Sequence, residues 1–148
     1  MRRMKRASSY MVIAGCLVLA AGVPLRQANG QAAAPSLDYE FFKNKVQPVF
    51  LTKRAGHTRC VVCHTTNNAP LHLVPLSPGS ATWNEQQSRQ NFQLVQKVVV
   101  PGYEGSKLLT HPLAIAAGGD PNHGGGKHFA SQQDPEWSIL KAFVFGAK

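Results

Sequence analysis

The amino-acid sequence predicts one small all-α domain with long loops, preceded by a removable N-terminal segment. Three observations support this prediction. Apolar residues recur at helical spacing in three stretches, and those stretches carry the capping and proline residues typical of helix ends. The stretches between them are rich in glycine, proline and asparagine and show no period, as loops do. There is no internal repeat and no convincing pair of strands.

Residues 1–30 have the parts of a secretory signal peptide. Four basic residues and no acid stand in the first ten positions, an apolar run follows, and small residues come next. The apolar run is shorter than the about 20 residues that a membrane-spanning helix needs. We therefore expect export to the periplasm or beyond, cleavage somewhere between residues 22 and 34, and one mature domain over residues 31–148.

Cys16 gives an alternative for the N-terminal segment. It ends the sequence IAGC, which resembles the lipobox of bacterial lipoproteins. The apolar run before it is short for a lipoprotein signal, so a cleaved signal is favoured. We expect association with a membrane only if Cys16 carries a lipid or the signal is retained.

Removal of residues 1–30 lowers the charge. The full chain has a formal net charge of +9, but five of its 16 Lys and Arg residues lie in that segment with none of its seven acids, which leaves +4. No Arg-rich run is interleaved with aromatic residues, so we expect no nucleic-acid binding. The mild basic surface favours acidic protein partners. The one loose basic cluster consists of Lys43, Lys45, Lys53, Arg54 and Arg59.

The first predicted helix starts near Ser36, with acids in its first turn. Its inward residues at helical spacing are Phe42, Val46 and Val49 or Phe50. Pro48 has no backbone N–H, so Gln47-Pro48 is expected to end or kink the helix. A polar loop then leads to a pair of cysteines.

Two further helices follow. The second covers residues 82–99, with a capping box of Thr82 and Glu85 and a stop at Pro101-Gly102. A short helical turn begins at Ser106, and residues 118–129 are flexible by composition. The last helix has Asp134 as N-cap, Pro135 at its first position and Gly146 at its end. The predicted inward residues of these helices are Trp83, Phe92, Val95, Val99, Trp137, Leu140 and Val144.

The motif with the clearest chemistry is C-V-V-C-H over residues 60–64. Cys60 and Cys63 lie three positions apart, so on a tight helical turn each thiol can add to one vinyl group of a haem, and His64 then projects its imidazole towards the iron. C-x-x-C-H is the attachment sequence of c-type haem, and permanent attachment suits an exported protein. The sequence therefore predicts one covalent haem c, with Cys60 and Cys63 as thioether positions and His64 as proximal ligand.

A thioredoxin-like pair and a structural zinc site also use closely spaced cysteines, but both fit this sequence less well. A thioredoxin-like C-x-x-C stands in a βαβ pattern, which is absent. A structural zinc site needs four ligands, and adjacent Cys63 and His64 cannot easily both reach one metal. Haem attachment is therefore the favoured interpretation of the motif.

The order of parts resembles class I cytochrome c. A first helix ending VQPVF, C-x-x-C-H soon after, a wrapping loop, a ligand-bearing loop and an aromatic-rich last helix follow one another over about residues 37–147. More narrowly, HGGGKHF followed by DPEWSILKAFVFGA is similar to the end of single-haem bacterial cytochrome c-like domains with an H-G-G-G loop. The resemblance implies a cytochrome c-like fold, an electron-transfer function, and first and last helices that cross.

The residues available as distal ligand differ from those of that family. Class I cytochromes usually present methionine, but Met1, Met4 and Met11 all lie in the predicted signal, so the mature chain has none. The resemblance implies His123 at the start of H-G-G-G, with His111 as second choice. His128 or an open site stays as a further alternative. We interpret His57 as a solvated loop residue and His72 as exposed or bonded to a haem propionate.

These residues predict an exported single-haem cytochrome that carries one electron at a time between redox proteins and is not an enzyme. Two imidazoles favour a lower potential than imidazole with thioether. Two alternatives stay open. One is a haem enzyme or gas-binding protein with an open sixth position, for which peroxidase-like activity is the example. The other is a haem subunit of a larger respiratory or structural assembly.

Overall fold

A computed structural model of the chain describes residues 33–66 and 69–148. The predicted signal peptide and Cys16 lie outside these residues. Ala32–Lys148 forms one compact unit. Its described residues are helical, with one isolated bridge between Leu113 and Phe129 and no strand, so the all-α prediction is confirmed.

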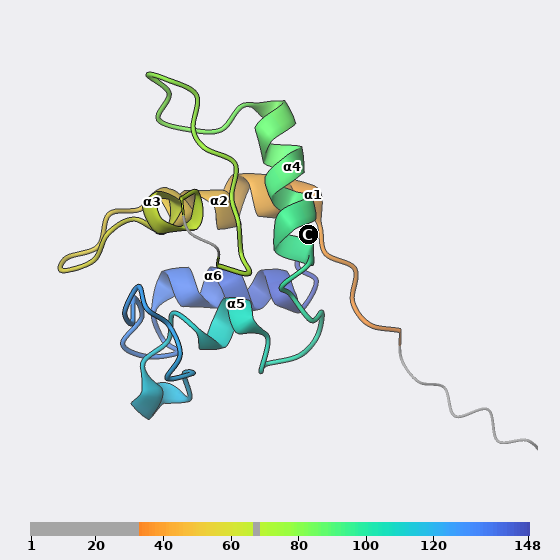
Figure 1. The fold of residues 1–148 in the computed structure, drawn as a ribbon. Coiled ribbons are helices and arrows are strands. Elements are labelled where there is room, and N and C mark those ends of the chain that lie inside the picture. The colour runs from red at the N-terminus through yellow and green to blue at the C-terminus, as the bar shows by residue number, and fades with distance from the viewer. Residues whose placement is uncertain (1–32, 67–68) are drawn as a thin grey trace, which may run out of the picture. The chain divides into compact units, whose positions relative to one another are not determined.

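Eight helical segments follow one another along the described chain (Figure 1). In the described residues no helix is long and apolar enough to cross a membrane. The segments are α1 (Tyr39–Phe41), the π-helical η1 (Phe42–Val46), α2 (Gln47–Leu51), α3 (Cys60–His64), α4 (Glu85–Gln96), α5 (Lys107–Thr110), the 3₁₀ turn η2 (Ile115–Ala117) and α6 (Pro135–Val144).

The first helix continues through Pro48, where the sequence predicted an end or a kink. Asp38 caps it, because its side chain accepts a hydrogen bond from the N–H of Phe41. From Phe42 the hydrogen bonds change to the π pattern, and the N–H of Gln47 donates to the carbonyl of Phe42. This local change of pattern precedes the residue that lacks a donor, and the helix then runs on to Leu51.

The capping box predicted for the second long helix was wrong by two residues. Asn84, not Thr82, is the N-cap, and its partner is Gln87, not Glu85. Each side chain accepts a hydrogen bond from the other residue's backbone N–H. α4 is therefore shorter than predicted. Trp83 and Val99 are buried as expected, but they lie just outside the helix.

The last two predicted elements are confirmed. Ser106 precedes α5, and α6 begins with Asp134 as N-cap and Pro135 at its first position. The Asp134 carboxylate accepts hydrogen bonds from the N–H groups of Glu136 and Trp137, which would otherwise have no partner in the helix.

The first and last helices pack together around aromatic side chains. α6 packs against η1, α4 also contacts η1, α3 packs against α2, and α5 packs against α6 (Figure 1). Phe42 is fully buried at the centre, with ring centroids 5.4 Å from Phe92, 5.7 Å from Phe143 and 6.5 Å from Phe50. The apolar faces predicted for the first and last helices are confirmed. This core fixes α2 and α6, against which α3 and α5 pack at the two sides of a cavity.

Candidate functional site

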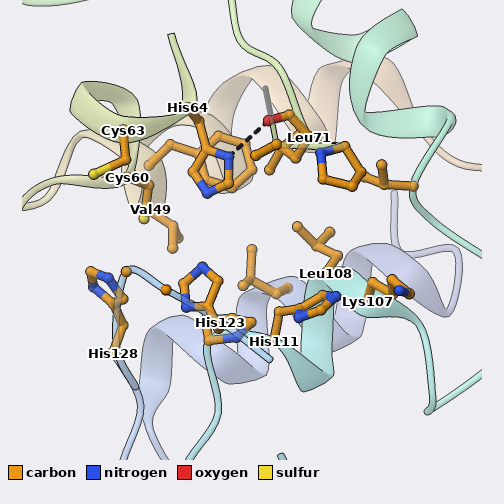
Figure 2. Close-up of a pocket in the computed structure, with 18 of the residues that line it drawn as sticks. Val49, Cys60, Cys63, His64, Leu71, Lys107, Leu108, His111, His123 and His128 are labelled. Atoms are coloured by element: carbon orange, nitrogen blue, oxygen red, sulfur yellow. Dashed lines mark hydrogen bonds between the residues drawn. The ribbon is translucent and has the colours of Figure 1, made fainter. Parts of the chain in front are cut away.

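A cavity of about 360 Å³ lies between two groups of residues (Figure 2). Its volume is in the range of about 300–1,000 Å³ that is usual for sites of small ligands and cofactors. It is partly open and its lining is mostly apolar. The cysteine wall comprises Val49, Phe50, Cys60, Cys63, His64 and Leu71; the histidine wall comprises Leu108, His111, His123, His128 and Phe129.

The C-x-x-C-H turn forms the helix that the sequence predicted, α3. Val61 is buried and anchors the turn, and the Thr65 hydroxyl donates a hydrogen bond to the Val61 carbonyl at 2.8 Å. Cys60 and Cys63 are both free and both line the cavity. Burial raises the pKa of the Cys60 thiol, with nearby Arg54 acting in the opposite direction. Two unbridged sulfurs therefore stand side by side at one end of the cavity.

His64 presents one ring nitrogen to the cavity. Its Nδ1 lies 2.8 Å from the carbonyl oxygen of Leu71. A carbonyl only accepts hydrogen bonds, so Nδ1 carries the proton and Nε2 keeps a lone pair. Burial lowers the pKa of His64, which favours the neutral ring. This is the form of histidine that binds a metal.

His123 is oriented in the same way from the other wall. Its Nδ1 lies 2.6 Å from the carbonyl oxygen of Gly126. The turn between them is made of glycines, and Gly126 has φ of +82°, a conformation that residues with a Cβ rarely adopt. Here too the backbone carbonyl accepts a hydrogen bond from Nδ1–H, so Nε2 is the ring nitrogen left to face the cavity.

The rings of His64 and His123 point toward each other across the cavity (Figure 2). Their centroids are 6.2 Å apart and their planes differ by 16°. An imidazole nitrogen lies about 2.0–2.1 Å from a metal such as zinc, so two opposed bonds and the two ring radii span about 6 Å. The observed separation fits one metal ion between the two nitrogens.

For a metal ion at this place, the protein offers two opposed side chains rather than a complete set of ligands. Among the described residues, no group of three or more His, Cys, Asp or Glu side chains is placed to hold a metal. A tetrahedral zinc site needs about four protein ligands. The arrangement instead suits a metal whose equatorial ligands come from a cofactor, beside two thiols that can bond to that cofactor.

His111 and His128 lie on either side of His123. Their ring centroids are 6.0 and 6.1 Å from that of His123, and among the described histidines only His123 has a ring contact with His64. His111 Nδ1 lies 3.7 Å from a carboxylate oxygen of Asp120. Burial and the neighbouring His57 lower the pKa of His128 to about 4. The structure thus places both alternative ligands in the cavity but beside the opposed pair.

The remaining two histidines, His57 and His72, have different surroundings. His57 is not a solvated loop residue: it is half-buried, and its ring centroid lies 4.5 Å from that of His128. The prediction fails because the loop before α3 folds against the glycine-rich loop, where His57 lies close to Gly126 and His128. His72 is exposed, one of the two fates expected for it.

Arg54 does not belong to a surface cluster, so that prediction was wrong. Its side chain is only 11% exposed and pairs with Glu136 at the start of α6. The guanidinium also lies over the Phe129 ring, 4.8 Å from its centroid, and donates to the carbonyl of Val49. Arg54 therefore joins the two walls. No spacing rule connects it with a carboxylate 82 residues away, so the sequence had no signal for this contact.

The carbonyls that orient the two rings were also missed. Every residue has a backbone carbonyl, so the sequence could not single out Leu71 or Gly126. Trp137 shows the same difficulty: its indole N–H donates to the carbonyl of Leu109 and fixes α6 to α5.

The chain was compared with protein-family models, curated proteins and solved structures. No protein-family model, curated protein or solved structure matches the chain. The site is therefore interpreted from its own residues and their arrangement.

Proposed function

We propose that the chain is an exported single-haem c-type cytochrome that carries electrons one at a time between redox proteins. The observation that carries the proposal is the opposed pair of His64 and His123, next to two free thiols in an apolar cavity. Porphyrin supplies the equatorial ligands that the protein lacks, and haem iron supplies a one-electron couple between its ferric and ferrous forms.

In this proposal the two thiols add to the haem vinyl groups and form thioethers. Each addition joins a cysteine sulfur to a vinyl carbon and transfers the thiol hydrogen to the neighbouring carbon. Cys60 and Cys63 then hold the cofactor permanently on the cysteine wall.

His64 and His123 are the residues that would hold the iron. Both donate Nδ1–H to a backbone carbonyl, which fixes the ring orientation and makes Nε2 a stronger ligand. Histidine with methionine raises the potential of a cytochrome, so two histidines favour a lower one. With both side chains bound to it, the iron would have no position left for a substrate. We therefore propose electron transfer, with acidic redox proteins as partners, rather than catalysis.

The test is ligand spectroscopy on the purified protein and on three single variants. Low-temperature EPR and near-infrared MCD of the wild type are expected to show low-spin ferric haem with two imidazoles. His123→Ala is expected to lose that signal and give a high-spin or mixed spectrum. His111→Ala and His128→Ala remove neighbouring rings from the same wall and are the matched controls, which should keep it.

Two results would contradict the proposal in different ways. A bis-imidazole signal that survives His123→Ala would show that another residue is the distal ligand. A high-spin ferric spectrum in the wild type would instead favour a haem protein with an open sixth position. His72→Ala, at an exposed histidine, controls for effects of substitution alone.

A further inference from the structure

The cavity has two ends of different chemistry (Figure 2). The sulfurs of Cys60 and Cys63 lie at one end, and the side chain of Lys107 lies at the other, with the opposed histidines between them. Lys107 is the first residue of α5, and the buried Leu108 and Leu109 that follow it fix the position of this helix.

Among the described residues that line the cavity, Lys107 is the charged side chain at that end. Apart from histidines, the charged residues that line the cavity are Arg59 and Lys107, and Arg59 directly precedes Cys60. Nearby Lys127 is engaged elsewhere, because its ammonium group donates to the carbonyls of His111 and Asp120. In the described part of the chain, Lys107 takes part in none of the ion pairs within 4.0 Å, and its ammonium group has no hydrogen-bond partner.

The haem has a matching asymmetry. Its two vinyl groups and its two propionates stand on opposite edges of the porphyrin. Thioethers at the cysteine end therefore turn the propionates toward the opposite end, where Lys107 lies. An ammonium group beside a carboxylate forms a charge-assisted hydrogen bond.

We propose that Lys107 binds a haem propionate and raises the reduction potential of the iron. This inference rests on the proposed function. Reduction adds one negative charge to the haem, and a fixed positive charge nearby stabilises the reduced form more than the oxidised form. Lys107 is exposed, so water screens the interaction and its effect is smaller than that of an axial ligand.

The experiment is a charge series at Lys107 in the haem-loaded protein. Midpoint potentials of the wild type, Lys107→Arg, Lys107→Gln and Lys107→Glu are measured by spectroelectrochemical titration. The potential is expected to stay near the wild-type value with Arg, to fall with Gln and to fall further with Glu. Redox-difference infrared spectra should show a shift of the propionate carboxylate bands in the Gln variant and its recovery with Arg.

Lys45→Glu is the matched control, because Lys45 is an exposed lysine of η1 that does not line the cavity. It changes the net charge by the same amount as Lys107→Glu. Equal shifts of potential in these two variants, or unchanged propionate bands in Lys107→Gln, would overturn the inference while leaving a bis-histidine cytochrome intact. Absence of covalent haem from the wild type would instead overturn the proposed function, and this inference with it.

Discussion

The two walls of the cavity are built from the chain in different ways. The chemical groups of the cysteine wall come from α3, where Cys60, Cys63 and His64 lie within five consecutive residues, and the carbonyl that orients His64 is only seven residues further on. The histidine wall has its candidate ligands at positions 111, 123 and 128, directly after α5 and in the loops that follow it.

This difference separates what local sequence determines from what tertiary packing determines. On the cysteine wall, the spacing of the motif places the thiols and the imidazole whatever the rest of the chain does. On the histidine wall, three histidines are candidates, and only tertiary structure distinguishes them: the His123 ring bonds to the Gly126 carbonyl and faces His64. Arg54 holds the two walls in register through Glu136 and Phe129.

The largest expected effect is on the cysteine wall. The double variant Cys60→Ala, Cys63→Ala removes both thioether positions and should abolish covalent haem, measured by haem staining after denaturing electrophoresis. His123→Ala belongs to the histidine wall and should leave the staining unchanged, because it alters ligation and not attachment. Undiminished staining of the double variant would contradict the proposal that the cysteine wall attaches the haem.

A pair of glycine substitutions tests how the histidine wall is held. Gly126 and Gly56 both have positive φ, +82° and +74°. Alanine in this left-handed conformation costs about 1–2 kcal/mol, so each variant should lower the free energy of unfolding in urea by that order.

The two glycine variants should differ in their spectra. A Cβ at Gly126 would lie 3.4 Å from His57 Nδ1, whereas one at Gly56 would meet nothing within 4 Å. We expect Gly126→Ala to shift the carbonyl that orients His123 and to change the EPR signal of the axial ligands. Gly56→Ala should leave that signal as it is. Identical EPR spectra for the two glycine variants would contradict the proposal that the Gly126 carbonyl orients His123.

The last expected effect is a pH dependence of stability. Burial, together with the neighbouring His57, lowers the pKa of His128 from 6.5 to about 4, so the unfolded chain binds a proton that the folded chain does not between these values. Stability should therefore fall as the pH decreases from about 6.5 to about 4. Urea unfolding at several pH values should show a smaller decrease for His128→Gln than for the wild type, and His72→Gln, at an exposed site, should behave like the wild type.

The sequence predicted the helices better than their ends. The burial of Phe42 and Val46 and the cap at Asp134 follow from local rules, and both were right. The capping rules failed where two nearby residues could each serve as the N-cap of the same helix. Asn84 and Thr82 are both good caps, and the contacts of this region with the preceding loop, such as the Trp83 indole N–H donating to the Val74 carbonyl, are not visible in the sequence.

The candidate site also has a part that the sequence predicted and a part that it could not predict. The motif identified Cys60, Cys63 and His64, and the count of methionines reduced the distal choices to histidines. The relation of His123 to His64 joins positions 59 residues apart, and no spacing rule reaches that far. The contact of His57 with His128 was missed for this reason.

The facing lone pairs of His64 and His123 bear on the maturation of the protein. A metal ion between the two ring nitrogens would stabilise the folded arrangement that brings them face to face, so under the proposed function, loading and folding are coupled. The cysteine wall is made of near neighbours in the chain and can react before the domain has folded. We expect haem attachment to come first, on an extended chain after export, and the closure of α6 with the histidine wall to complete the coordination.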